Sequence, residues 1–402
     1  MPDRLPLMFI LLTVMIDTMG IGLVLPVMPD LIREVDGGTL ADAAIWGGVL
    51  VTVFAVMQFL FGPIMGSLSD RYGRRPVLLI TLFILTLDYL VMAVAGTIWL
   101  LFAGRVVGGM VAATQSTATA YIADISKPED KAARFGLIGA AFGVGFVLGP
   151  LIGGLLAEFG TRAPFYGAAA LAALNLVFGY FVLPETVTDR TRRAFSWVRA
   201  NPLGAFSQVG SQPGLGRLLV IFFLYQTAFF VYPAIWAYFT QERFGWSPGM
   251  IGVSLASFGV AIALVQGGLI RVILSRLGDR GTMKFGLIFN FFAFLALALV
   301  TSGPLALVLT PLTALGAVVT PALQGIMSRA VGDDAQGELQ GVISSTGALS
   351  TIVSPMIMTS VFYAFTTDGA PIYLPGAPFL VSMLLMVACM GVFLAPARRA
   401  NT

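Results

Sequence analysis

Long apolar stretches alternate with short polar segments along almost the whole chain. Each stretch holds about 20 residues, the length of a helix that crosses the hydrocarbon core of a bilayer. The pattern therefore predicts twelve transmembrane helices in an all-α membrane protein. The predicted spans cover about 5–27, 44–65, 77–95, 98–122, 135–157, 164–183, 215–240, 248–270, 284–301, 303–328, 339–362 and 376–396.

One longer polar stretch, 184–214, separates the sixth predicted span from the seventh. It predicts an N-terminal six-helix half over 1–183, a cytoplasmic linker over 184–214 and a C-terminal six-helix half over 215–402. The first apolar run, from Leu5 to about Val27, is too long for the short core of a signal peptide, so we expect it to remain as the first helix.

Composition supports lipid as the solvent of this chain. Of the 402 residues, 57% are hydrophobic and only 11% are charged, and the mean hydropathy is +0.91. A soluble domain usually carries about 25% charged residues. A water-facing surface of this size cannot be built from so few charges, which indicates an integral membrane protein.

The rare residue types exclude several kinds of chemistry. The chain has no histidine and a single cysteine, Cys389, so intramolecular disulfides, zinc sites and histidine-dependent triads or dyads are all excluded. The formal charge of +3 is too small to indicate nucleic-acid binding. We therefore expect neither an enzyme nor a cofactor, metal or nucleic-acid partner.

The basic residues predict an orientation, because cytoplasmic loops keep an excess of lysine and arginine. With the N-terminus inside, the opposite loops hold only Arg33, Arg162 and Arg243 of the 23 lysines and arginines. Arg105 lies inside a span, and all the others fall on the cytoplasmic side. Both termini are therefore predicted to be cytoplasmic.

The two halves show an internal repeat. A shift of 205 residues lays the sequence from Arg71 to Arg75 on that from Arg276 to Arg280, and Pro150 on Pro355. Three further glycine pairs share this offset: Gly47 with Gly252, Gly62 with Gly267, and Gly136 with Gly341. The alternative is a chance coincidence in glycine-rich helices. Two parallel repeats are a known transporter plan, in which the substrate site lies near the midplane between them.

The loop between spans 2 and 3 carries a compact motif. Gly66 permits a tight turn, and Asp70 can cap the next helix or pair with an arginine. A simple cytoplasmic anchor would need only the arginines. The stretch resembles the loop signature GxxxDRxGRR of the major facilitator superfamily, which is thought to latch the two halves in the outward-facing state. The resemblance implies latch residues Gly66, Asp70, Arg71, Gly73, Arg74, Arg75 and, just after span 4, Asp124.

Span 5 contains a second motif, formed by Gly145, Gly149, Pro150, Gly153 and Gly154. Glycines four apart let two helices touch backbone to backbone, and a proline bends the helix. Packing alone is one explanation. The stretch also resembles the antiporter signature of the same superfamily, which is found mainly in exporters and so favours export over uptake.

Further stretches resemble the tetracycline-resistance branch of the drug:proton antiporters. They include 16–22, 87–90, 122–124, 242–246 and 321–325. The resemblance implies the twelve-helix major facilitator fold with two pseudo-symmetric halves, in a bacterial inner membrane. Pumps of this branch carry a buried histidine in helix 8 and an aspartate in helix 9, whereas this chain has Ile262 and Asn290 there. Tetracycline itself is therefore one candidate substrate among amphipathic drugs.

Three ionisable residues lie well inside predicted spans: Asp17, Asp88 and Arg105. Each is costly in lipid and is a functional candidate for that reason. At a rise of about 1.5 Å per residue, Asp88 and Arg105 reach the same depth from opposite sides, so an ion pair between them is geometrically feasible. A purely structural salt bridge is the alternative for Asp88. Asp17 has no sequence-local partner, and we predict proton coupling by Asp17, Asp88 and Arg105.

Neutral polar residues in other spans extend the predicted cavity. Besides Asp17, the candidate substrate-binding residues are Gln58, Gln115, Gln226, Asn290 and Gln324. Each of them has interhelical hydrogen bonding as an alternative role.

These features predict a secondary active transporter that exports a small amphipathic molecule in exchange for protons by alternating access. Proton-coupled uptake of a metabolite by symport is the first alternative, and a receptor or scaffold that transports nothing is the second. We expect its partners to be a small-molecule substrate, protons and membrane lipid, and we expect a monomer.

Overall fold

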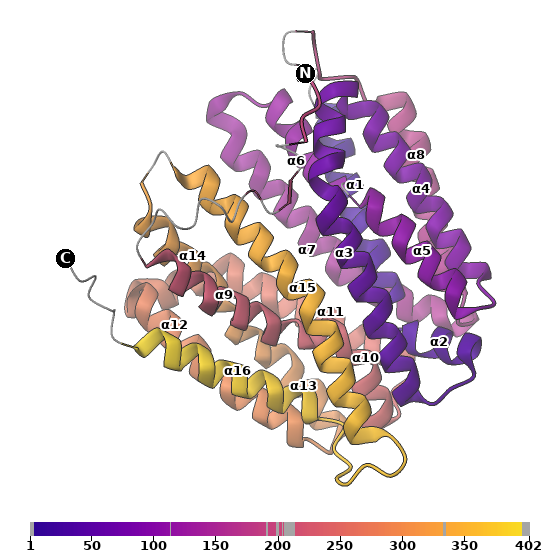
Figure 1. Cartoon of the computed structure of the whole chain (residues 1–402), viewed down its shortest axis with the longest axis vertical. Coiled ribbons are helices and arrows are strands. Elements are labelled where there is room, and N and C mark those ends of the chain that lie inside the picture. The colour runs from indigo at the N-terminus through magenta and orange to yellow at the C-terminus, as the bar shows by residue number, and fades with distance from the viewer. Residues whose placement is uncertain are drawn as a thin grey trace. The chain divides into compact units, whose positions relative to one another are not determined.

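The computed structural model describes residues 4–112, 114–189, 192–197, 201–202, 204, 214–332 and 335–395. Within these ranges the regular structure is entirely helical (Figure 1). The first part contains α1 (Arg4–Val24), α2 (Met28–Asp36), α3 (Leu40–Tyr72), α4 (Arg74–Val94), α5 (Ile98–Val111), α6 (Thr114–Ile125), η1 (Pro128–Asp130), α7 (Lys131–Leu156), η2 (Ala157–Phe159) and α8 (Ala163–Val182). The second contains α9 (Leu215–Phe229), α10 (Val231–Phe244), α11 (Pro248–Leu264), η4 (Val265–Leu269), α12 (Ile270–Leu299), α13 (Gly303–Thr313), η5 (Ala314–Val318), α14 (Val319–Ala330), α15 (Gln336–Thr366) and α16 (Ala377–Leu394).

The helices account for all twelve predicted spans. Eleven helical stretches of the described chain are long and apolar enough to cross a membrane. One of them, Pro248–Leu299, contains the two predicted spans 248–270 and 284–301. Instead of a loop, a kink separates these two spans, where Gly278 has a φ of 62° and a ψ of 175°. The predicted all-α, twelve-helix membrane fold is confirmed.

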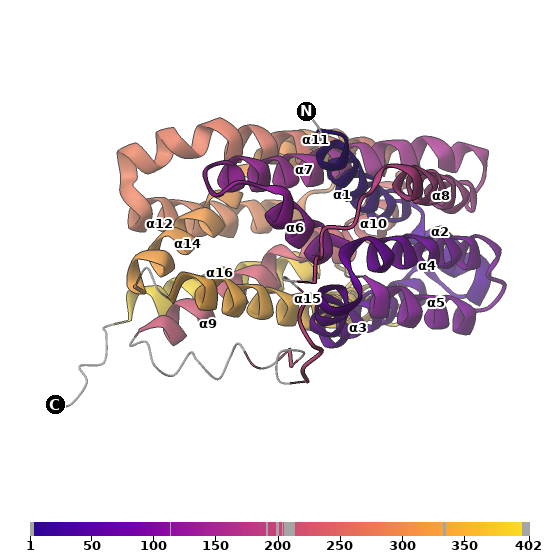
Figure 2. The same cartoon turned by 90° about the horizontal axis from the view of Figure 1, so that it is seen from above.

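The chain divides into two compact units. The first comprises Met1–Pro202 and Trp246–Ala256, and the second comprises Leu203–Gly245 and Ser257–Thr402. In the first, α1 packs along α7 and α8, and α4 packs against α5 and α8. Figure 2 shows α3, α4 and α5 running side by side. In the second unit, α9 packs against α15 and α16, and α12 packs against α16 and α14.

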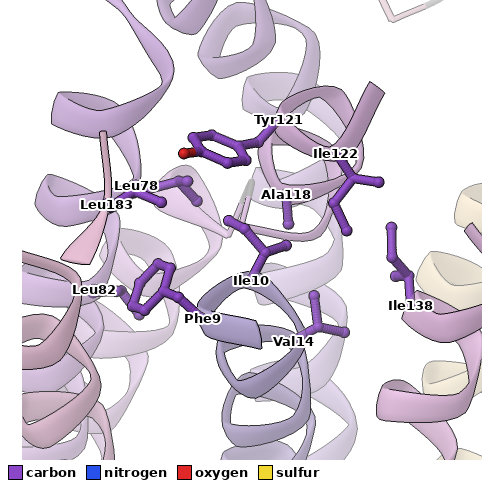
Figure 3. Packing of buried hydrophobic residues seen from close by; sticks show 10 residues of the cluster. All are labelled: Phe9, Ile10, Val14, Leu78, Leu82, Ala118, Tyr121, Ile122, Ile138 and Leu183. Atoms are coloured by element: carbon purple, nitrogen blue, oxygen red, sulfur yellow. The ribbon is translucent and has the colours of Figure 1, made fainter. Parts of the chain in front are cut away.

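A cluster of buried apolar side chains lies at one end of the first unit, where it packs several helices together (Figure 3). Phe9 and Ile10 of α1 contribute fully buried side chains, as do Leu78 of α4 and Tyr121 of α6. Leu183, the residue that follows α8, is also buried there. The cluster therefore ties α1, α4 and α6 to the point where the chain leaves α8 for the linker.

Several predicted spans are interrupted inside the apolar stretch. The fourth stops being helical at Ala112, between α5 and α6, and the seventh is broken at Phe230, between α9 and α10. The tenth passes through the 3₁₀ turn η5 between α13 and α14. Proline explains part of this, because Pro233 and Pro321 lack the N–H group that would continue the helical ladder.

Candidate functional site

The two charged residues of spans 3 and 4 form a buried ion pair. The guanidinium of Arg105, from α5, donates to the carboxylate of Asp88, from α4. The Asp88 side chain is 1% exposed and that of Arg105 is 16% exposed. The predicted pairing of these residues is confirmed, and α5 and α4 are the elements that hold them.

Two glycines of α5 make room for the Asp88 carboxylate. A Cβ atom on Gly104 would lie 2.8 Å from Asp88 Oδ1, and one on Gly108 would lie 2.7 Å from Asp88 Oδ2. Both distances are shorter than a real contact allows. The side chain of Asp88 therefore sits in a notch that any larger residue at Gly104 or Gly108 would fill.

Arg105 has further contacts that hold it in place. Its guanidinium carbon lies 5.1 Å from the ring centre of Phe54 on α3, a cation–π distance. One guanidinium nitrogen also lies 2.7 Å from the sulfur of Met92 on α4. The positive charge is thus held between an aromatic face, a polarizable sulfur and one carboxylate.

Asp17 has no such counter-charge. It lies half-buried on α1, and the residues that the structure describes offer it neither a hydrogen bond nor an ion pair. One turn further along α1, the hydroxyl of the buried Tyr89 lies against Gly20. Tyr89 is within electrostatic range of Asp17, Asp88 and Arg105. All three predicted charges therefore act electrostatically on one side chain.

The sequence pattern alone does not identify Tyr89 as a site residue. The only signal for it is its position next to Asp88 in the 87–90 stretch. A tyrosine in an apolar helix is usually a packing residue, and its relation to Asp17 depends on how α4 is rotated toward α1.

Two of the predicted polar residues bond to the interrupted helices. Gln58 of α3 donates its amide N–H to the carbonyl of Ala112, 3.1 Å away, where the fourth span breaks. Asn290 of α12 donates to the carbonyl of Gly316 in η5, 3.0 Å away, and Tyr225 of α9 donates to the same oxygen at 3.0 Å. These amides satisfy carbonyl groups near helix breaks.

The two breaks occupy corresponding places in the repeat, because Ala112 and the η5 residue Ala317 differ by the offset of 205. The other predicted polar residues contribute less to the described contacts. Gln226 of α9 accepts a hydrogen bond from Thr320 at 3.4 Å, and Gln324 of α14 is half-buried. The side chain of Gln115 lies outside the described residues. Ile262 of α11 is half-buried, and Asn290 is fully buried.

The loop 2–3 motif folds into a network around Arg74. Its guanidinium lies 2.6 Å from the Asp70 carboxylate and 3.3 Å from that of Asp124 on α6. It also donates at 2.5 Å to the hydroxyl of Ser69, which in turn donates to the Gly66 carbonyl at 2.8 Å. We call Asp70, Arg74 and Asp124 the latch cluster.

The remaining motif residues lie around this cluster. Gly73 has a φ of 110°, which an L side chain rarely adopts, and it separates α3 from α4. Arg71 stacks over the ring of Tyr72, its own neighbour. Arg75 donates to the carbonyl of Tyr180 on α8 at 2.8 Å. All seven predicted latch residues therefore lie at one end of the first unit.

The second half holds a counterpart of this cluster with its charges exchanged. Asp279 pairs with Arg329 of α14, and these positions lie 205 residues after Arg74 and Asp124. Gly278, at the position equivalent to Gly73, also has a positive φ. An ion pair conserved in place but reversed in sign supports the predicted internal repeat.

The span 5 motif provides a close helix contact. Added Cβ atoms on Gly145, Gly149 and Gly153 would all collide with the backbone of α1. On Gly149 the added atom would be 2.9 Å from the Cα of Gly22. Gly154 approaches Pro248 in the same way, and Pro150 approaches Gly252. The predicted backbone-to-backbone packing is confirmed.

The fold and these buried charges define a polytopic membrane protein built like a transporter. The sequence profile of the Major Facilitator Superfamily matches residues 10–355 and 219–400. The chain belongs to that superfamily, whose members are transporters and not enzymes.

Individual relatives agree over nearly the full length. The chain is 41% identical over 389 residues to the tetracycline resistance protein, class C, of Escherichia coli, covering 96% of this chain and 95% of that protein. It is 38% identical to the class E protein of the same organism, with 89% and 88% covered. Among solved structures, the human organic anion transporter MFSD10 is 26% identical, with a TM-score of 0.71 and coverage of 98% and 100%.

Proposed function

We propose that this protein exports an amphipathic drug of the tetracycline type in exchange for protons, by alternating access. Its place is a bacterial inner membrane, with both termini in the cytoplasm. The similar Escherichia coli proteins are named for tetracycline resistance, which supports the substrate class, and a transporter that gives resistance to a drug would do so by exporting it. The close packing of the span 5 motif on α1 agrees with the resemblance to exporters.

The observation that carries the proposal is the contrast between the buried carboxylates. Asp88 has a full counter-charge in Arg105, whereas Asp17 has none among the described residues. A carboxylate in an apolar helix without a partner is unstable as an anion and takes up a proton readily. Asp17 is therefore the proton carrier, whereas Asp88 keeps its negative charge because Arg105 balances it.

Tyr89 completes this arrangement. Its hydroxyl lies against α1 one turn from Asp17, and its own helix carries Asp88. A hydroxyl both donates and accepts hydrogen bonds, so Tyr89 can follow a change in the protonation of Asp17. Protonation of Asp17 competes with binding of a cationic or polar drug group, which couples the two fluxes.

The interrupted helices support a transporter mechanism. Helix breaks at corresponding positions of two repeats are the sequence-level mark of a transporter binding region. The breaks at Ala112 and in η5 carry this mark, and Gln58 and Asn290 bind beside them. Gln58, which is exposed, is the candidate for direct contact with the drug, and the fully buried Asn290 holds the corresponding break in the second half.

The test uses purified protein in liposomes with an imposed proton gradient and radiolabelled tetracycline. Asp17→Asn should abolish uphill accumulation while the protein remains folded in the membrane. Asp42→Asn is the matched control, because Asp42 accepts hydrogen bonds only from Thr39 at the start of α3. Unchanged proton-driven accumulation in Asp17→Asn would refute the role of Asp17. Movement of tetracycline in the same direction as the protons would instead establish uptake by symport.

A further inference from the structure

The first residues of the linker run across the ends of α4 and α6. Glu185, two residues beyond Leu183, accepts hydrogen bonds from the backbone N–H groups of Arg74, at 2.9 Å, and Arg75, at 3.2 Å. These are the first two residues of α4. The two contacts use different oxygens of the carboxylate, so Glu185 holds the helix end with both.

This contact supplies hydrogen-bond acceptors that the N-terminal end of α4 lacks within its own helix. The first N–H groups of a helix have no partner within the helix, and the N-terminal end of the helix favours a negative charge. The residue before α4 is Gly73, which has no side chain to cap them. Glu185 supplies the cap from 111 positions away in the sequence.

Gly73 is matched to Glu185 in space. A Cβ atom at position 73 would lie 2.7 Å from the carboxyl carbon of Glu185. Two separate constraints therefore require glycine at position 73: its positive φ, and the space that the Glu185 carboxylate occupies. The second constraint comes from a residue that lies outside the motif.

Other linker contacts reach the latch cluster directly. The hydroxyl of Thr186 donates at 3.1 Å to Asp124 Oδ2, the same oxygen that Arg74 contacts. The backbone N–H of Arg193 donates to the Asp70 carbonyl at 3.2 Å. Tyr121, which belongs to the cluster in Figure 3, donates its hydroxyl to the Pro184 carbonyl at 3.1 Å. The described linker residues thus contact both acidic members of the latch cluster.

We propose that Glu185 is a positioning residue for transport, which acts by fixing the start of α4 so that Arg74 stays paired with Asp70 and Asp124. The described linker residues Pro184, Glu185, Thr186 and Arg193 then belong to the latch and do more than connect the two halves. This inference rests on the proposed transport function for its kinetic consequences. Its structural part, the coupling of Glu185 to Gly73, stands independently.

The kinetic experiment measures tetracycline transport in liposomes at matched protein density. Loss of a helix cap typically changes an equilibrium about fivefold, so Glu185→Ala should lower kcat about threefold to fivefold and leave KM unchanged. Glu185→Gln keeps one acceptor oxygen and should recover part of the rate. Glu129→Ala is the control, since Glu129 is exposed and accepts no described hydrogen bond. A wild-type kcat in Glu185→Ala, or a change in KM alone, would overturn the proposal.

A second arm separates positioning from a general effect on folding. If Glu185 acts through the latch cluster, Glu185→Ala should cause little further loss of kcat in an Asp124→Asn background. Independent roles would multiply the two losses. Multiplied losses would overturn the positioning role.

A third arm needs no transport. Thermal unfolding in detergent, followed by far-ultraviolet circular dichroism, is compared for Gly73→Ala, Glu185→Ala and the double variant. Because the added methyl group competes with the Glu185 carboxylate, Gly73→Ala should lower the melting temperature less in the Glu185→Ala background than in the wild type. Equal lowering in both backgrounds would overturn the cap. If wild-type protein transports no drug, this arm still decides the inference, while the proposed function fails.

Discussion

The buried Asp88–Arg105 pair allows the most quantitative prediction. Asp88→Asn leaves the guanidinium of Arg105 without its counter-charge, and the side chain of Arg105 is only 16% exposed. Removing one partner of a buried ion pair costs about 3–5 kcal/mol, because the other charge stays buried and unpaired. Arg105→Met should cost a similar amount, since it strands the carboxylate of Asp88.

The double variant Asp88→Asn with Arg105→Met behaves differently. It removes both charges, and the methionine side chain can occupy the space beside Phe54 and Met92. Replacing a buried ion pair with well-packed neutral groups is often close to neutral. We therefore expect the double variant to recover to within about 1–2 kcal/mol of the wild type, although transport should stay low.

The assay is urea unfolding in detergent, followed by far-ultraviolet circular dichroism. Arg192→Ala is the control, because its pair with Asp189 is exposed and 3.9 Å long, and exposed pairs contribute about 1 kcal/mol or less. A double variant as unstable as either single variant would refute the pairing argument. Single variants as stable as the control would refute it as well.

Three other contacts have consequences that can be measured. Gly149→Ala should destabilise the protein by about 1–3 kcal/mol, because the new methyl group meets the backbone of α1. Gly139→Ala on the same helix, where the space is open, should be neutral or slightly stabilising. Urea unfolding measures the stability of both variants. Asp279→Arg and Arg329→Asp should each cost about 1 kcal/mol or less, since Arg329 is 62% exposed, and the exchanged pair should restore stability. The rate at which a thiol-reactive dye labels the buried Cys389 reports this, and an exchanged pair worse than either single variant would contradict it. Tyr89→Phe should fold normally yet lower proton-coupled tetracycline flux about tenfold, because this variant lacks the hydroxyl near Asp17. Flux at the wild-type level would show that Tyr89 has no part in the mechanism.

The fold could be predicted from the sequence because the length of an apolar run and the positions of the arginines are read directly from neighbouring residues along the chain. It also predicted the Asp88–Arg105 pair, since depth along a helix is set by residue count. The same counting placed the glycines of span 5 on one face. These are properties of single helices or of neighbouring ones.

Other features depend on how helices are rotated and joined, and no local pattern carries that information. The notch formed by Gly104 and Gly108 requires that α5 turn these residues toward α4. Asn290 was predicted to bind substrate, and the structure places its amide on Gly316, a contact that depends on the break in η5. The cap by Glu185 joins residues 111 positions apart, so the linker seemed to be a simple connection.

The kink at Gly278 shows a related limit. The sequence indicated a polar boundary between spans 8 and 9, and a loop was the simplest expectation. Only one residue there leaves the helical conformation, and the helix resumes immediately. A single glycine with a positive φ can therefore redirect a chain where several polar residues would otherwise predict a loop.

Export of a drug in exchange for protons can be measured as drug-dependent proton movement. Purified protein is placed in liposomes with a trapped pH-sensitive dye, tetracycline is added, and proton release that depends on the drug is followed. We expect prompt release from wild-type protein and none from Asp17→Asn. Folded wild-type protein that releases no protons with tetracycline or with other amphipathic drugs would rule out drug:proton exchange.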